Sequence, residues 1–199
     1  MVKPWCFFHG WGLGGFVWAD AAASLPQAQV FDRGYFGPGQ PLALPQGRAV
    51  CHSQGLHVLL QQDLTHVQEL VVINGFLDFT PQRRAITAMA ARLKGDPHGL
   101  LQDFYQQTCS PAPCLWQPLA PTDPALLMAD LLALLEPPDL TKLPQCLRIW
   151  LVWGGQDAVL KPRQQAALTA ALPQAQPITL PQAGHWVSWA TLFPLLEAI

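Results

Sequence analysis

Short apolar runs recur along this chain, and most of them end in a turn that leads into a helical stretch. The runs are residues 5–8, 29–32, 48–52, 69–74, 147–153 and 176–180. A run that is apolar at nearly every position, such as 69–74, is typical of a strand covered on both faces of a parallel sheet. The helical stretches are residues 16–24, 56–64, 163–172 and 188–199. Alternating strands and helices predict an α/β layered domain with right-handed crossovers.

Residues 79–143 interrupt this alternation. They contain helical stretches that proline breaks repeatedly, so we interpret them as a helical insertion and not as a layer of the sheet. The whole chain has 199 residues, the size of one domain. We therefore predict a core formed by residues 1–78 and 144–199 and a helical lid subdomain formed by residues 79–143.

The charge and hydropathy of the chain exclude several classes of function. A net charge of −2, with only 12% charged residues, gives no basic field that could hold nucleic acid or an anionic membrane surface. The apolar runs fall short of the roughly 18–20 residues that a membrane span needs. The first residues do not have the pattern of a signal or transit peptide. We therefore expect a cytoplasmic protein that binds neither nucleic acid nor membrane, and we expect a monomer.

A serine lies at the junction between one predicted strand and the helix that follows it. Residues 50–56 read Val-Cys-His-Ser-Gln-Gly-Leu. A sharp turn that presents a nucleophile needs small residues two positions before and two positions after it, because larger side chains would strike the neighbouring strand and helix. Gly55 meets this requirement, and the small Cys51 stands where glycine is usual. We predict that Ser53 is a nucleophile.

Two further residues supply what a serine nucleophile lacks. A hydroxyl is a poor nucleophile at neutral pH and needs a positioned base. His185 follows the last predicted strand, and Asp157 follows the strand before it. In a parallel sheet both reach the edge where Ser53 lies, and we assign His185 as the base and Asp157 as the group that orients it. Asp78, after the 69–74 strand, is the alternative acid.

The turn after the first strand supplies a place for the oxyanion. Residues 9–12 read His-Gly-Trp-Gly. We predict that the backbone amides of Trp11 and Gln54 donate to the oxygen that becomes negative in the transition state. Two such donors would each lower the barrier by a few kcal/mol.

The same segment also matches a different motif. Gly10, Gly12 and Gly15 have the G-x-G-x-x-G spacing of a dinucleotide-binding turn, and Asp32 ends the next predicted strand. Against this interpretation, the bulky Trp11 occupies a position where the backbone must approach a pyrophosphate. The motif also leaves the three candidate catalytic residues without a role. We therefore predict no cofactor.

The cysteines and the remaining histidines give no sign of a metal centre. The five cysteines show no C-x-x-C spacing, so we expect neither structural zinc nor a framework of disulfides. The remaining histidines are His52, His57, His66 and His98, of which His57 and His66 lack a partner at ligand spacing. We expect them to be packed or solvated side chains, with no metal bound.

Taken together, these motifs resemble the α/β-hydrolase superfamily. The His-Gly-Trp-Gly-Leu stretch at 9–13, with Trp18 downstream, is similar to the pimeloyl-acyl-carrier-protein methyl ester esterases of biotin synthesis. The resemblance implies a trimmed α/β-hydrolase fold, with a mostly parallel sheet, helices on both faces and a helical lid insertion. We call it trimmed because the chain begins at the His-Gly strand and because only about 20 residues separate Asp32 from Ser53, too few for the usual crossover.

The resemblance also implies an activity and a partner. It implies a serine carboxylesterase that hydrolyses the methyl ester of pimeloyl-acyl-carrier protein and releases methanol. The alternatives are a general short-chain esterase or thioesterase, and a non-catalytic binding protein of the same fold.

The first helix of the insertion carries the candidate surface for the carrier. At 100° per residue, one side of it is apolar and the other is cationic. The apolar residues are Ile86, Met89, Ala90 and Leu93, and the cationic residues are Arg83, Arg84, Arg92 and Lys94. Either the cations form a solvated helix face, or they dock the acidic acyl carrier protein that the resemblance implies.

Aromatic residues supply a candidate slot for an acyl chain beneath the lid. They are Trp11, Phe76, Phe104, Trp116 and Trp186. The alternative is that each belongs to the ordinary hydrophobic core. We predict that Phe76 and Trp186 contact the substrate beside Trp11.

Overall fold

The computed structural model describes residues 3–25, 27–40 and 44–199. In this part of the chain, six parallel strands form one sheet in the order β2-β1-β3-β4-β5-β6. The strands are β1 (Trp5–Phe8), β2 (Ala28–Phe31), β3 (Gln46–His52), β4 (His66–Ile73), β5 (Arg148–Gly154) and β6 (Gln176–Leu180). The predicted parallel α/β sheet is confirmed.

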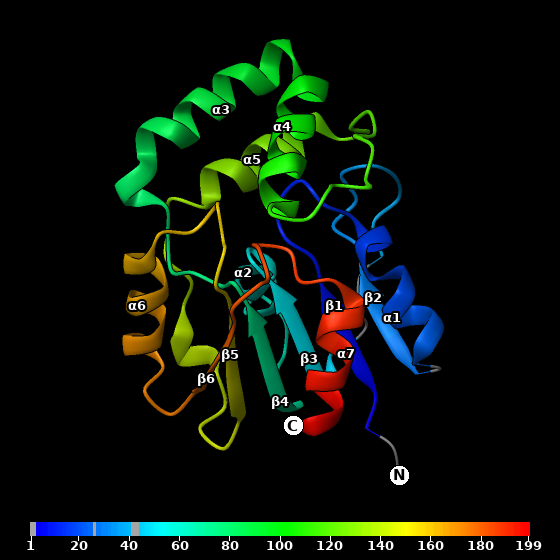
Figure 1. Ribbon diagram of the computed structural model, residues 1–199, viewed down its shortest axis with the longest axis vertical. Helices are drawn as coiled ribbons and strands as arrows, with labels where there is room; N and C mark the ends of the chain where they lie inside the picture. Colours follow the sequence, from blue (N-terminus) through cyan, green and yellow to red (C-terminus); the bar gives the residue numbers. More distant parts are fainter. Residues whose placement is uncertain (1–2, 26, 41–43) are drawn as a thin grey trace.

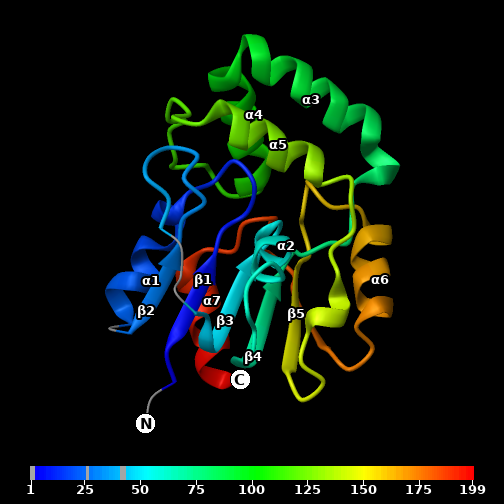
Figure 2. The same cartoon turned by 180° about the vertical axis from the view of Figure 1, so that it is seen from behind.

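Helices cover both faces of this sheet, as predicted (Figures 1 and 2). On one face, α1 (Ala19–Ser24) and α7 (Trp189–Ala198) are joined by a hydrogen bond of 3.2 Å from the Trp189 indole N–H to Ser24 Oγ. On the other face lie α2 (Gly55–Leu59) and α6 (Pro162–Ala171), whose Leu56 and Leu168 both approach Gly75. Burial on two faces explains the nearly continuous apolar sequences of β4 and β5.

Two helix boundaries differ from the predictions. The helix predicted at 56–64 ends at Leu59, because the chain then tightens into a turn in which the N–H groups of Gln61 and Gln62 donate to Val58 O and Leu59 O at 3.1 and 2.9 Å. The helix predicted at 16–24 begins as a 3₁₀ turn, η1 (Gly15–Trp18), before α1. In both places the local turn chemistry outweighed the apolar periodicity.

The three longer helices of the inserted segment, residues 79–143, lie over the carboxyl ends of the strands (Figure 1). The segment contains η2 (Thr80–Gln82), α3 (Arg83–Gly95), α4 (Pro97–Cys109), α5 (Pro124–Ala133) and η3 (Leu140–Lys142). Pro97 and Pro124 begin helices instead of breaking them, since the first helical position needs no backbone N–H. The preceding Asp96 and Asp123 cap these helices by accepting backbone N–H groups.

Hydrogen bonds, two of them fully buried, fasten the inserted segment to the loops of the core. The Trp11 indole N–H donates to Leu127 O at 2.9 Å, and the Tyr105 hydroxyl donates to Gly12 O at 2.7 Å. Asp130 of α5 accepts two N–H groups of Arg33, at 2.7 and 2.9 Å. The segment is therefore held directly above the turn that follows β1. No helix in the described residues is long and apolar enough to cross a bilayer.

Candidate active site

Ser53 occupies a strained turn between β3 and α2. Its φ is 55°, in the left-handed region that residues other than glycine rarely adopt. A Cβ on Gly55 would lie 2.6 Å from the carbonyl oxygen of Phe8, so only glycine fits there. A Cβ on Gly10 would likewise lie 3.0 Å from Ser53 Cβ. The fully buried Cys51 fills the other small-residue position. The turn therefore has the close backbone packing that the sequence motif predicts.

The structure brings His185 and Asp157 to this serine. His185 Nε2 lies 3.0 Å from Ser53 Oγ, and His185 Nδ1 lies 2.8 Å from Asp157 Oδ2. An ionised carboxylate can only accept, so Nδ1–H donates to Asp157 and Nε2 is left to accept the serine hydroxyl. The imidazole is fully buried, and the serine is 7% exposed. The three groups form one continuous chain of hydrogen bonds.

Asp157 is itself fixed by the backbone. Its Oδ1 accepts the N–H groups of Val159 at 2.7 Å and Leu160 at 2.9 Å, which leaves Oδ2 for the imidazole. Asp78, the alternative acid, is engaged elsewhere, where its carboxylate accepts the N–H of Thr80 at 2.7 Å. The geometry therefore places Asp157, not Asp78, against His185.

The two predicted oxyanion donors flank the serine. Among the described hydrogen bonds, the backbone N–H groups of Trp11 and Gln54 have no acceptor. Their side chains point to other partners, since the Gln54 amide donates to Asp130 O at 3.1 Å. Only their backbone amides are thus free to face a substrate oxygen.

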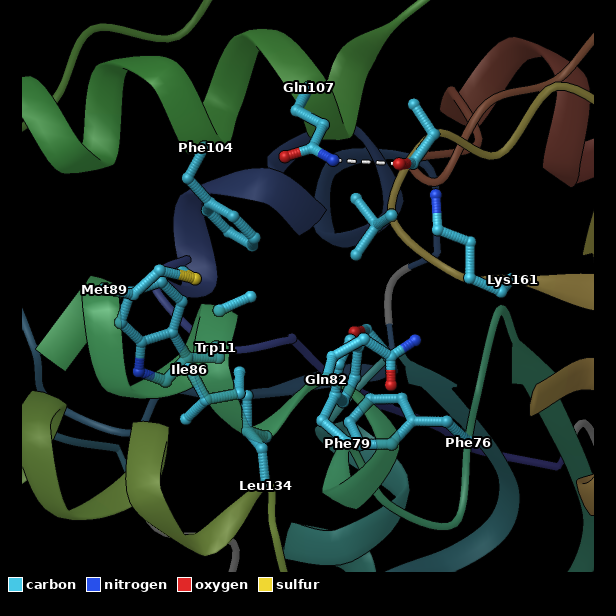
Figure 3. Close-up of a pocket in the computed structure, with 14 residues that line it drawn as sticks. Trp11, Phe76, Phe79, Gln82, Ile86, Met89, Phe104, Gln107, Leu134 and Lys161 are labelled. Carbon is cyan, nitrogen blue, oxygen red and sulfur yellow. Dashed lines mark hydrogen bonds between the residues drawn. The ribbon is translucent and has the colours of Figure 1, made fainter. Parts of the chain in front are cut away.

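A cavity of about 200 Å³ opens beside Ser53 (Figure 3). Its apolar lining comes from the core and from the inserted segment, and comprises Trp11, Phe76, Phe79, Ala85, Ile86, Met89, Phe104, Leu134, Ala158 and Val159. Its polar lining residues besides Ser53 are Gln82, Gln107 and Lys161. Such a cavity suits a short apolar group bound next to the hydroxyl.

The sequence analysis placed two tryptophans in this cavity that the structure places elsewhere. Trp116 and Trp186 pack against each other, with ring centroids 5.1 Å apart, and line a second cavity beyond the His185 loop. Trp186 also packs against Trp18 of η1, with ring centroids 4.9 Å apart. Phe79 and Leu134 also line the Ser53 cavity, and the sequence carries no signal that distinguishes them. They come together only in the folded chain, where the Phe79 N–H donates to Leu134 O at 2.7 Å.

The cations predicted on the first inserted helix all lie on exposed positions of α3. Arg92 is paired within the insertion, at 2.6 Å from Asp103 and 3.4 Å from Asp96. Arg83, Arg84 and Lys94 have no carboxylate partner among the described ion pairs. The apolar side of α3 faces inward as predicted, with Ile86 and Leu93 buried.

The competing dinucleotide motif has an internal role. Asp32 Oδ2 accepts the Gly15 N–H at 2.7 Å, and its Oδ1 accepts the Gly34 N–H at 2.9 Å. Burial alone would raise the pKa of Asp32. The contact with His9 and the two backbone donors outweigh this effect and lower the pKa to about 2. The carboxylate thus holds two loops together instead of offering itself to a ribose. Within the described residues, no cluster of His, Cys, Asp or Glu side chains is arranged to hold a metal ion.

Comparison with known proteins identifies the fold. No protein-family model and no curated protein matches the chain. The esterase EaEST from Exiguobacterium antarcticum superposes with a TM-score of 0.77 at 14% identity, over 99% of this chain and 90% of that one. A hydrolase from Oleispira antarctica gives 0.77 at 14% identity, over 100% and 90%. An α/β hydrolase from a Medee basin deep-sea metagenome gives 0.70 at 12% identity, over 98% and 86%. The chain has the α/β-hydrolase fold.

Proposed function

We propose that this protein is a serine-dependent hydrolase of carboxylic esters. The observation that carries the proposal is the unbroken chain of hydrogen bonds from Asp157 through His185 to Ser53, which ends at an apolar cavity. Fold neighbours described as esterases, from Exiguobacterium antarcticum and Thermogutta terrifontis, are in line with this chemistry.

The geometry supports an acyl-enzyme mechanism. His185 Nε2 takes the proton of Ser53 as the serine oxygen attacks the ester carbonyl. The negative oxygen that forms is held by the backbone N–H groups of Trp11 and Gln54. His185 then protonates the departing alcohol, and water repeats the sequence to release the acid. Asp157 stabilises the imidazolium at each stage without taking the proton.

Replacing the nucleophile tests this proposal. Ser53→Ala is expected to lower kcat on short-chain nitrophenyl esters by at least about 10³-fold, because the rest of the site cannot form an acyl-enzyme. Ser24→Ala, at the exposed end of α1, is the matched control and is expected to retain full activity. A fluorophosphonate probe should label the parent at Ser53. A folded parent that neither hydrolyses esters nor takes up the probe would instead indicate a non-catalytic binding protein.

We propose further that the substrate is a methyl ester on an acyl chain held by acyl carrier protein, with pimeloyl as the acyl group. The cavity supports this because its lining beside Ser53 is mostly apolar, as a hydrocarbon chain requires. Arg83, Arg84 and Lys94 also support it, because they are exposed cations on α3, the helix whose other side lines that cavity. Arg92 is not included, since Asp96 and Asp103 already neutralise it.

Charge reversal on α3 tests the carrier. A triple variant, Arg83→Glu with Arg84→Glu and Lys94→Glu, is expected to raise KM for the carrier-bound methyl ester and to leave small nitrophenyl esters unaffected. Lys142→Glu, an exposed cation in η3, is the control. Equal effects on both substrates would contradict the docking role, and release of free carrier instead of methanol would indicate a thioesterase.

A further inference from the structure

Asn74 is an unusual residue at the end of β4. It is fully buried, and its φ of 47° lies in the left-handed region, where a residue other than glycine is strained. Its own backbone N–H donates to Val152 O of β5 at 2.9 Å. A strained and buried polar residue persists only where the surrounding structure holds it in place.

The side chain of Asn74 joins the two loops that carry the acid and the base. Its Oδ1 accepts the N–H of Gly154, where β5 leads into the Asp157 loop, at 2.9 Å. Its Nδ2 donates to Gly184 O at 3.0 Å and to His185 O at 2.7 Å. One carboxamide thus makes three buried hydrogen bonds to segments that lie far apart in the sequence.

A second buried donor reaches the same carbonyl. His52 Nε2 lies 3.0 Å from His185 O, and since a carbonyl only accepts, the His52 ring donates through Nε2–H. Burial, and to a smaller extent the nearby His185, hold the pKa of His52 well below 6.5. The ring is therefore neutral and stacks edge-on against the His185 imidazole, with centroids 4.9 Å apart. Two donors from the core fix the backbone of the base.

We propose that Asn74 is a positioning residue, which sets the separation of the Asp157 and His185 loops and so maintains the hydrogen bonds between the two side chains and Ser53. The proposal rests on the proposed ester hydrolase function. Asn74 does not line the Ser53 cavity and touches no reacting atom. It acts by geometry alone, and a displacement of about 1 Å at a reacting group can cost about 100-fold in rate.

The chemistry of the amide is what the position requires. The site presents one donor, the Gly154 N–H, and two acceptors, the carbonyls of Gly184 and His185. A carboxamide matches both kinds of group. An aspartate of the same shape could still accept from Gly154, but its carboxylate would face two carbonyl oxygens that it cannot donate to.

Asn74→Gly tests the role directly, because glycine accepts the left-handed backbone and removes only the side chain. It is expected to lower kcat for nitrophenyl esters about 100-fold and to leave KM nearly unchanged. It is also expected to abolish the far-downfield proton NMR signal of the His185 Nδ1–H that donates to Asp157. Unchanged kcat together with an unchanged signal in the folded variant would overturn the proposal. If Asn74→Gly does not fold, the same two measurements on the isosteric Asn74→Asp decide it.

Gln164→Ala provides a control of matched chemistry. Gln164 of α6 is also a buried carboxamide that links loops, donating to Asp78 O at 3.1 Å and accepting from Lys161 N at 3.0 Å and from Gln82 Nε2 at 2.8 Å. It meets the acid loop only at Lys161, where α6 begins, and it bonds neither to Asp157 nor to the His185 loop. Gln164→Ala should lower the stability of the protein and keep the downfield signal of the His185 Nδ1–H. If both Gln164→Ala and Asn74→Gly lose that signal, the loss reflects a general loss of stability, and the specific role of Asn74 is overturned. The NMR measurement needs no turnover, so it decides the role of Asn74 even if the parent hydrolyses no ester, the result that would overturn the proposed function.

Discussion

Asp157 and Asp78 both follow strands at the same edge of the sheet, yet only one of them meets His185. Asp157→Asn should lower kcat by about 10⁴-fold, because an amide in this position favours the wrong tautomer of the imidazole. Asp78→Asn is the matched control and should retain kcat within a few-fold. The measurement is kcat for a nitrophenyl ester, with circular dichroism to confirm folding. A larger loss of kcat in Asp78→Asn than in Asp157→Asn would show that Asp78, and not Asp157, is the acid that orients His185.

At the scale of single residues, the sequence could identify Ser53, His185 and Asp157 as candidates because each sits in a local pattern of strand, turn and neighbouring glycine. It could not choose between Asp157 and Asp78, since both patterns end at the same edge. It gave no signal for Asn74, whose importance arises from one side chain that reaches two distant loops. Trp186 was placed in the wrong cavity because its packing against Trp18 is a long-range contact.

At the scale of elements, strands were easier to predict than helix ends. The strands are buried and apolar, so their positions agree closely with the runs in the sequence. Helix boundaries depend on single hydrogen bonds, such as those of the Gln61 and Gln62 N–H groups in the turn that ends α2 early. The amphipathic pattern of α3 was sufficient to predict which side faces inward, because burial of an apolar stripe is what holds a surface helix in place.

The inward side of α3 also suggests a test of the cavity. Met89 lines the cavity, whereas Thr87 lies on the exposed side of the same helix. Met89→Trp should reduce kcat/KM for longer acyl esters about tenfold or more relative to acetyl esters, because the larger ring fills space that the chain would occupy, and each methylene excluded from an apolar site is worth about 1–3 kcal/mol. Thr87→Trp should leave the chain-length profile unchanged. Equal profiles for parent and Met89→Trp would show that acyl chains do not enter this cavity.

At the scale of the whole molecule, function and stability are supported at opposite ends of the sheet. The carboxyl ends of the strands carry Ser53 and the loops of His185 and Asp157. Toward the amino ends lies Glu69, whose side chain is only 2% exposed and which Arg48 and Arg148 flank on the neighbouring strands. Glu69 Oε2 lies 2.6 Å from Arg48, its Oε1 lies 2.9 Å from Lys3, and Arg148 also pairs with Oε1. One buried carboxylate thus links three central strands and the start of the chain.

Glu69→Gln should therefore lower the free energy of unfolding by about 2–3 kcal/mol, the size expected for lost hydrogen bonds to a charged group, and leave kcat unchanged at 25 °C. Burial raises the pKa of Glu69, but the hydrogen bond from Lys3 and the charges of Arg48, Lys3 and Arg148 bring it below its ordinary 4.5. As the pH falls below 4.5, the carboxyl of the unfolded chain takes up a proton before that of the folded chain, so the parent loses stability. The gap between the free energies of unfolding of the parent and of Glu69→Gln therefore narrows. Urea unfolding at several pH values measures this gap. A gap that stays constant down to pH 3 would show that the charge of Glu69 does not stabilise the sheet, and a fall in kcat would show that the two ends of the sheet are coupled.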